Sequence, residues 1–114
     1  MSETLALTPS ESVTVQDSSH AALDVEATYA PHGSPPPRHL HPSQAEHFEV
    51  LEGSILTRVN KAERRLMVGD TLDVPARTEH QIWNPGDMAA RVSWRTAPAG
   101  RTLEWFRALD ALQQ

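Results

Sequence analysis

The chain has 114 residues, a formal net charge of −5 and no cysteine, and a chain of this length is expected to form one domain, over residues 1–114, whose core needs no disulfide or metal staple. The absence of thiols excludes disulfides, thiolate metal sites and cysteine nucleophiles. The acidic balance offers no electrostatic route to a nucleic-acid backbone, and no apolar run approaches the roughly 20 residues of a membrane span, so we expect a soluble, cytoplasmic protein without a nucleic-acid or membrane partner.

Most of the chain has the pattern of short strands. The first ten residues are polar, contain Pro9 and are expected to be loosely ordered. From Ser12 onward apolar residues recur at every second position, which predicts half-buried strands. We expect these strands around residues 13–15, 23–29, 48–50, 55–59, 64–68, 72–74 and 91–97. Many short strands at close spacing, joined by turns such as Asn60-Lys61, favour an all-β sandwich or barrel.

Two segments break this pattern. Residues 34–37 read Ser-Pro-Pro-Pro, and because proline has no backbone donor they predict an extended, polyproline-like segment. Near the C-terminus, Thr102 is expected to cap a helix over about residues 102–113. The helix carries one apolar stripe: Leu103, Phe106, Leu109 and Leu112. We expect this stripe to pack against the barrel, because a short helix rarely stands alone.

The histidines carry the strongest chemical signal. His39 and His41 are two residues apart, so on a strand both side chains leave the same face and suit convergence on one cation. Pro42 steers His41 toward extended backbone, and a turn after it can bring Glu46 back beside the pair on the next strand. Two histidines and a carboxylate are the ligand set of a facial triad with open coordination positions. His80 begins a later strand after a Pro-containing turn and could supply a fourth ligand from across a barrel.

These residues stand at the spacing of two motifs, and the pair resembles the signature motifs of the cupins, G(X)5HXH(X)3,4E(X)6G and G(X)5PXG(X)2H(X)3N. The matching residues are Gly33, His39, His41, Glu46 and Gly53 in the first motif and Gly69, Pro75, His80 and Asn84 in the second. The departure is Arg77, where the family usually has glycine. Because glycine permits a positive φ, Arg77 predicts a different turn geometry or mild strain just before His80.

The resemblance, to small single-domain metal-binding cupins of the cupin 2 type, covers most of the chain. It implies a double-stranded β-helix, or jelly-roll β-barrel, over about residues 23–97. It also implies that four residues bind a divalent metal: His39, His41, Glu46 and His80. The alternative is a cupin that keeps the motif but binds no metal. Cupins of this size resemble one another in forming dimers, so we expect a homodimer.

The implied ligand set constrains the metal. Three imidazoles and one carboxylate leave two positions open on an octahedral ion, whereas zinc is almost always four-coordinate in closed sites. We therefore favour Fe(II), Mn(II), Ni(II) or Cu(II) over Zn(II). Glu46 is also the expected catalytic base, because it can take a proton from a bound enol or hydroxyl. The expected substrate pocket is apolar and includes four residues: Phe48, Val50, Ile82 and Trp94.

Three functions remain open at this point. The first is a metal-dependent enzyme acting on a small organic molecule, and we favour a dioxygenase similar to ring-cleaving cupins, with substrate and O2 at the metal. The second is a non-oxidative isomerase, lyase or cyclase that uses the metal as a Lewis acid. The third is a binding or sensor module without turnover, whose DNA-binding form is disfavoured because too few residues lie outside the barrel for a helix-turn-helix.

Overall fold

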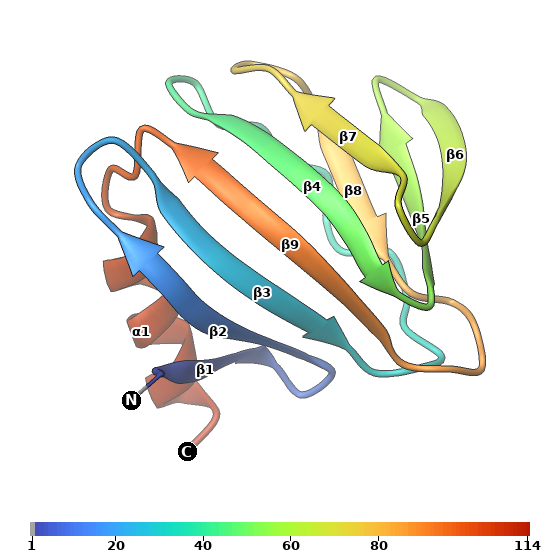
Figure 1. Cartoon of the computed structure of the whole chain (residues 1–114), viewed down its shortest axis with the longest axis horizontal. Coiled ribbons are helices and arrows are strands. Elements are labelled where there is room, and N and C mark those ends of the chain that lie inside the picture. Colours follow the sequence, from blue (N-terminus) through green and yellow to red (C-terminus); the bar gives the residue numbers. More distant parts are fainter. Residues whose placement is uncertain (1) are drawn as a thin grey trace.

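Buried and exposed residues alternate along most strands, and this alternation assembles two antiparallel sheets (Figure 1). The computed structural model describes residues 2–114. The large sheet has six strands in the order β1 (Thr4–Thr8), β2 (Glu11–Ser18), β3 (Leu23–Tyr29), β9 (Ala90–Ala97), β4 (Ala45–Glu52) and β7 (Thr71–Val74). The small sheet has three, in the order β6 (Ala62–Met67), β5 (Ser54–Val59) and β8 (His80–Trp83). With helix α1 (Thr102–Leu112), they confirm the predicted all-β jelly roll with a short C-terminal helix.

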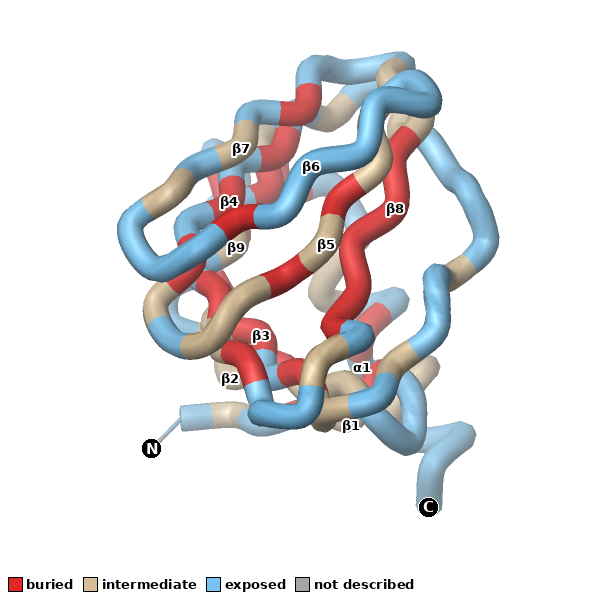
Figure 2. The backbone as a smooth tube through the Cα atoms, turned by 90° about the vertical axis from the view of Figure 1, so that its right-hand side faces the viewer, coloured by how far each residue is buried: buried red, intermediate tan, exposed pale blue. Residues whose placement is uncertain are grey.

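The core lies between the two sheets. Leu23 and Val25 on β3 and Phe48 and Val50 on β4 are almost completely buried, and each such side chain contributes about 1.5–3 kcal/mol relative to an exposed one. Figure 2 shows buried residues along the length of β8, which is buried at all four positions. Glu46 belongs to the same inward-facing series as Phe48 and Val50, so β4 carries a carboxylate into the interior.

The N-terminal residues differ from the expectation of loose order. Thr4–Thr8 forms β1, which pairs antiparallel with β2 and packs along α1. Leu5 and Leu7 are buried, so the period-two alternation already operates here. The Ala6 amide also donates a hydrogen bond of 2.9 Å to Asp110 Oδ1 on α1. The expectation was wrong for this strand, because its partners come from parts of the chain that local composition does not report.

Helix α1 begins at Thr102, but Thr102 is not its cap. The N-cap residue is Arg101, which makes no side-chain capping hydrogen bond. The Thr102 hydroxyl instead accepts a hydrogen bond from Gln44 Nε2 at 2.9 Å, which ties the start of the helix to the segment before β4. The predicted capping role was wrong because a tertiary partner uses the hydroxyl.

The apolar stripe of α1 is shorter than the sequence predicts. Phe106 is buried, and Leu103 and Leu109 pack against the core. Leu112, the last residue of the helix, is 78% exposed and lies outside this contact.

Within residues 2–114, no helix has the length and apolar character that crossing a membrane requires.

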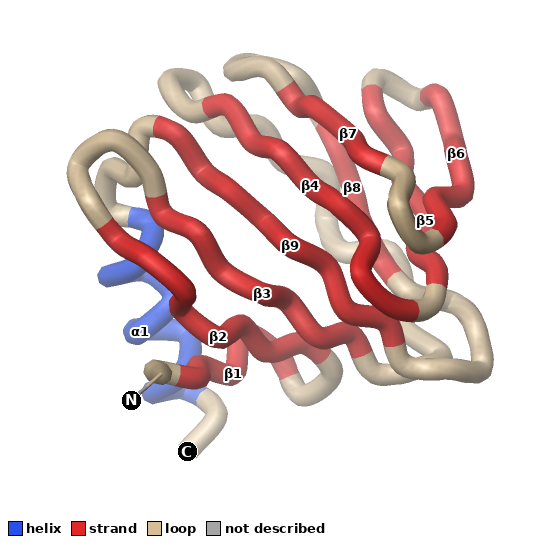
Figure 3. Tube along the Cα trace, in the orientation of Figure 1, coloured by secondary structure: helices blue, strands red, loops and turns tan. Residues whose placement is uncertain are grey.

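The connection from β3 to β4, residues 30–44, is mostly irregular (Figure 3) and carries three histidines, His32, His39 and His41. Hydrogen bonds hold it to β8 and to the loop after β8. Gln81 Nε2 donates to the Pro36 carbonyl at 2.6 Å, which fixes the proline segment against β8. The Gly33 amide donates to the Asn84 carbonyl at 2.7 Å. A Cβ at Gly33 would lie 3.0 Å from that same oxygen, so this close approach favours glycine.

Candidate metal centre

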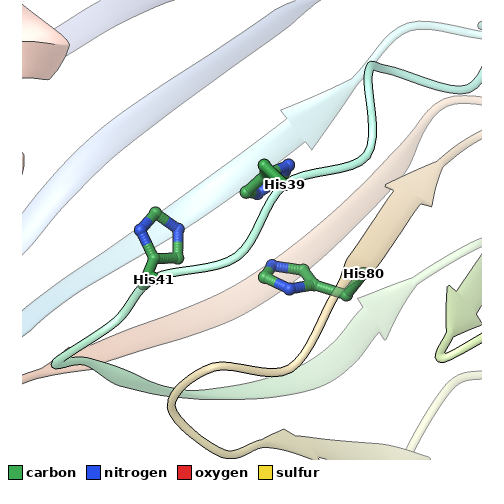
Figure 4. A group of neighbouring side chains, drawn as sticks. All are labelled: His39, His41 and His80. Atoms are coloured by element: carbon green, nitrogen blue, oxygen red, sulfur yellow. The ribbon is translucent and has the colours of Figure 1, made fainter.

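Three imidazoles gather beside the start of β8 (Figure 4). His39 and His41 come from the connection before β4, and His80 is the first residue of β8; one nitrogen from each ring lies within 4.8 Å of the other two. His80 is buried, His41 is half-buried and His39 is exposed. The sequence places His39 and His41 on a strand, whereas the structure has only an isolated bridge between His39 and His80. That bridge is enough to bring the pair against β8.

Two backbone hydrogen bonds set the spacing of the histidines. The His80 amide donates to the His39 carbonyl at 3.0 Å, and the Arg77 amide donates to the His41 carbonyl at 2.8 Å. Arg77 makes its bond from a left-handed conformation, with φ of 64°. The sequence predicts either a different turn geometry or mild strain at this position. The turn keeps the positive φ that glycine would allow, so the outcome is mild strain.

Hydrogen bonds to carbonyl groups fix the tautomers of two of the histidines. His80 Nδ1 lies 2.9 Å from the Thr78 carbonyl oxygen, and His39 Nδ1 lies 3.2 Å from the Pro37 carbonyl oxygen. A carbonyl oxygen only accepts, so each Nδ1 is the donor and carries a proton. In the neutral ring the Nε2 lone pair is then free to bind a cation, which is the usual arrangement around metal-ligating histidines.

Glu46 lies beside the three histidines. Its Oε2 accepts a hydrogen bond of 2.6 Å from Trp94 Nε1. Its Oε1 is 3.0 Å from His80 Nε2 and 3.4 Å from His41 Nε2, yet this buried oxygen accepts no hydrogen bond of acceptable geometry from residues 2–114. An oxygen and a ring nitrogen that approach with facing lone pairs repel each other unless a proton or a cation lies between them.

The electrostatic environment favours an anionic Glu46. Burial by itself raises the pKa of Glu46, but contacts with His80, His41 and Trp94 together lower it below its usual value. Burial lowers the pKa of His80, and this effect is outweighed by Glu46 and the Thr78 carbonyl, so the pKa of His80 is raised. For His39, burial is the largest influence and the pKa is lowered, which favours the neutral ring that a metal requires.

The donor set is therefore compatible with a divalent ion. Three imidazoles contribute nitrogen donors, and Glu46 Oε1 is a buried, unpartnered oxygen facing them. Nitrogen and carboxylate donors suit Fe, Mn, Ni, Cu and Zn ions, and a cation would satisfy the oxygen that the protein itself leaves without a hydrogen bond.

A cavity of about 220 Å³ adjoins this centre. Its lining residues are Leu7, Thr8, Glu11, Tyr29, Pro36, His39, Glu46, Phe48, His80, Ile82, Trp94, Trp105, Phe106 and Leu109. Phe48 and Trp94 stack with ring centroids 5.6 Å apart and form an aromatic wall. Most of the surface is thus apolar, with His39, His80 and Glu46 forming one polar region.

The sequence predicts part of this cavity. Three of the residues proposed for the substrate pocket, Phe48, Ile82 and Trp94, line this cavity. Val50 does not line it; it is 1% exposed and packs in the core. Val50 shares the inward face of β4, but it lies further along the strand than the cavity extends. Trp105 on α1 and Glu11 at the start of β2 also line the cavity, but the sequence did not predict this. Neither the apolar pattern of a helix nor a single glutamate at the start of a strand indicates which cavity the side chain will face.

Comparison with known proteins identifies the family. The family model described as the cupin domain matches residues 25–95. The chain belongs to the cupin family. Sixty residues are 37% identical to the tetracenomycin polyketide synthase protein TcmJ of Streptomyces glaucescens, covering 53% of this chain and 40% of that protein. Fifty-two residues are 40% identical to the probable oxidoreductase virH of Hypocrea virens, covering 45% of this chain and 24% of that protein. The matched segments thus span less than half of either curated relative.

Solved structures show the same cupin fold. KdgF from a Halomonas species superposes with a TM-score of 0.77 at 17% identity, covering 89% of this chain and 92% of that one. An RmlC-like cupin from Shewanella frigidimarina superposes with a TM-score of 0.78 at 18% identity, covering 90% of this chain and 88% of that one. At these identities the likeness concerns the fold, and function has to be argued from the site.

Proposed function

We propose that this cupin is a metal-dependent enzyme that oxidises a small aromatic or enolic molecule, with O2 as co-substrate. The observation that carries the proposal is a cluster of three histidines and a buried, unpartnered carboxylate oxygen beside an apolar cavity. The match to virH, a relative named as a probable oxidoreductase, adds support for redox chemistry. An aromatic substrate fits the stacked wall of Phe48 and Trp94.

In this proposal four residues hold the ion: His39, His41, His80 and Glu46. Fe(II), Mn(II), Ni(II) or Cu(II) remains favoured over Zn(II), because an octahedral ion keeps open positions after binding four protein donors. When bound, the ion would act as a Lewis acid that polarises the oxygen atoms of a bound substrate.

Glu46 supplies the proton chemistry. Trp94 donates a hydrogen bond of 2.6 Å to Oε2 and fixes the orientation of the carboxylate, while Oε1 faces the histidines. Contacts with His80, His41 and Trp94 lower the pKa of Glu46, so the carboxylate is ionised at neutral pH. Oε1 would accept a proton from a substrate hydroxyl when it is not itself bound to the ion. The aromatic walls position the substrate and exclude water from this transfer.

A second candidate is a non-oxidative conversion, such as cyclisation or isomerisation, of a polyketide-like molecule. It is favoured by the match to a polyketide synthase protein, because polyketides carry enolisable carbonyl groups. The same Glu46 would take the proton, and the difference lies in whether O2 is consumed.

The test is oxygen uptake and product analysis after reconstitution of the protein with each of the favoured metals. Small phenols and enols are the substrates, and Glu46→Gln is compared with Glu49→Gln, a change at an exposed carboxylate on the same strand. We expect O2 consumption and an oxygenated product, with loss of turnover only in Glu46→Gln. Product formation under strict anaerobiosis would establish the non-oxidative reaction instead. Recovery of every compound unchanged would contradict both and leave a binding module.

A further inference from the structure

The cavity beside the metal centre has a second polar region, on strands β2 and β3 of the large sheet that also contains β4. Glu11 and Tyr29 both line it. They come from β2 and β3, whereas Glu46 and His80 come from β4 and β8. The cavity therefore carries polar groups both beside the histidines and on the β2–β3 wall.

Strand pairing holds Glu11 and Tyr29 together. Glu11 is the first residue of β2 and stands opposite Tyr29, the last residue of β3, in the antiparallel register. The Ala30 amide donates to the Ser10 carbonyl at 2.8 Å and closes this end of the ladder. Asn84 Nδ2 reaches the Tyr29 carbonyl at 3.3 Å. The two side chains are thus presented from a rigid part of the sheet.

The Glu11 carboxyl has no cationic partner. Among residues 2–114, no arginine, lysine or histidine lies within ion-pair distance of it. The residues that α1 brings to the cavity are Trp105, Phe106 and Leu109, all without charge. Burial raises the pKa of Glu11 to about 7, against a smaller lowering by the Tyr29 hydroxyl. A carboxyl in such surroundings is costly unless a hydrogen-bond donor satisfies it.

The size of the cavity limits what can lie between the two polar regions. A cavity of about 150 Å³ holds a benzene molecule, and this one measures about 220 Å³. The aromatic residues on its walls favour a flat ligand. A substituted aromatic molecule of one or two rings therefore fits the space.

We propose that Glu11 and Tyr29 form a second subsite that binds a hydroxyl group of an aromatic substrate, at a position separate from the oxygen atoms that face the histidines. This inference rests on the proposed function and names its substrate class: a hydroxylated aromatic molecule with polar groups at two ends. Glu11 accepts the hydrogen bond of the substrate hydroxyl, and Tyr29 orients the carboxyl. Glu11 is thus a specificity residue and takes no part in the proton transfer at Glu46.

The experiment compares two probes that differ only in one donor. Naphthalene-2,3,6-triol carries a hydroxyl at the far end of the ring system, and 6-methoxynaphthalene-2,3-diol replaces it with a group that cannot donate. Binding is measured by titration calorimetry on Ni(II)-loaded protein without oxygen, so the readout does not depend on turnover and the ion keeps open coordination positions. At pH 8, above the raised pKa of Glu11, we expect the triol to bind at least about tenfold more tightly than the methoxy compound, the range for a hydrogen bond to a charged group.

Variants assign this preference to the subsite. Glu11→Leu is expected to bring the affinity ratio of the two probes close to one, while Glu11→Gln, which keeps an accepting oxygen, retains part of the preference. Glu49→Leu, at an exposed position on β4, is the matched control and is expected to keep the wild-type ratio. Circular dichroism of each variant verifies the fold.

The outcomes separate this subsite from the proposed function. Equal affinity of the two probes for the wild-type protein overturns the subsite without any variant, and leaves the oxygen-uptake test of function untouched. Persistence of the preference in folded Glu11→Leu protein overturns it as well. If neither naphthalene compound binds, the aromatic substrate class fails, and the subsite fails with it.

Discussion

At the scale of single residues, the histidine cluster depends on where ring protons reside. His80 and His39 each use Nδ1 to donate to a main-chain carbonyl, at 2.9 and 3.2 Å. Each ring is thereby oriented with Nε2 available, and Glu46 Oε1 faces Nε2 of His80 at 3.0 Å. The backbone thus fixes the orientation of these two rings.

Removing two of these donors tests the centre directly. We expect the double variant His39→Ala/His41→Ala to lose bound metal, measured by elemental analysis after reconstitution, because one imidazole and one carboxylate are too few donors. The β-rich circular dichroism should be unchanged, since His39 is exposed and His41 half-buried. His47→Ala is the control, because His47 is exposed and pairs with Asp73 on the neighbouring strand. An unchanged metal content in the double variant would refute the site.

Glu11 provides a second residue-scale prediction, in the pH dependence of stability. Its pKa is raised from 4.5 to about 7 by burial, so the folded state retains a proton that the unfolded state releases. Stability therefore falls as pH rises between these two values, by up to about 3 kcal/mol. Glu11→Gln cannot ionise and escapes this loss, so its free energy of unfolding relative to wild type should increase from pH 4.5 to pH 8.

Urea denaturation at the two pH values measures this difference. Glu49→Gln serves as the control, because Glu49 is exposed on β4 and its replacement should leave the pH dependence of the wild type in place. A constant difference in unfolding free energy between Glu11→Gln and wild type would contradict the raised pKa of Glu11.

At the scale of elements, the turn before β8 determines how His80 meets the other histidines. Arg77 occupies a left-handed conformation and donates its amide to the His41 carbonyl at 2.8 Å. The hydrogen bond requires the conformation rather than the arginine side chain. The turn therefore forms although arginine disfavours a positive φ, and the backbone at Arg77 carries mild strain.

Substitutions at Arg77 should separate backbone strain from side-chain effects. Arg77→Gly is expected to be neutral or to stabilise by up to about 1 kcal/mol, because relief of left-handed strain is partly offset by the larger unfolded-state entropy of glycine. Arg77→Val should lower the unfolding free energy by about 1–2 kcal/mol, because a β-branched residue tolerates a positive φ least.

Chemical denaturation of the two variants measures these changes. Arg64→Val is the control, because Arg64 is an exposed residue within strand β6, where valine is well tolerated. Equal destabilisation by glycine and valine at position 77 would show that the arginine side chain, and not its φ angle, matters.

At the scale of the whole molecule, the assembly state remains a prediction. The exposed apolar residues include Met67, the last residue of β6, and Val68, which follows it; they are 53% and 63% exposed. Apolar side chains in adjacent exposed positions favour association with a second surface. We therefore predict that the protein is a homodimer, and sedimentation velocity at micromolar concentration should give the mass of two chains. Met67→Ser/Val68→Ser should weaken the dimer, whereas sedimentation of the wild type as a monomer would contradict it.

The sequence by itself determined the class of fold and three residues of the cluster. Period-two alternation reports directly which residues face inward, because side chains alternate across a strand, and it placed Glu46 on the inner face of β4 with Phe48. The spacing of His39 and His41 predicted that these two side chains leave the same face of the chain. The approach of His80, far along the chain, was implied only by the resemblance to the cupin motifs, because it depends on a tertiary contact with the segment that carries His39.

Only the tertiary structure decided which side chains share the cavity and what satisfies their polar atoms. Thr102 was predicted as a helix cap, but its hydroxyl accepts a hydrogen bond from Gln44. The N-terminal strand β1 is held by β2 and α1. Glu11 lines the cavity from its place opposite Tyr29 in the sheet. These outcomes depend on contacts between residues far apart in the chain. Local propensity carries no record of such partners. The histidine cluster and part of the aromatic lining could therefore be predicted from the sequence, whereas Glu11, Tyr29 and Trp105 on the cavity wall could not.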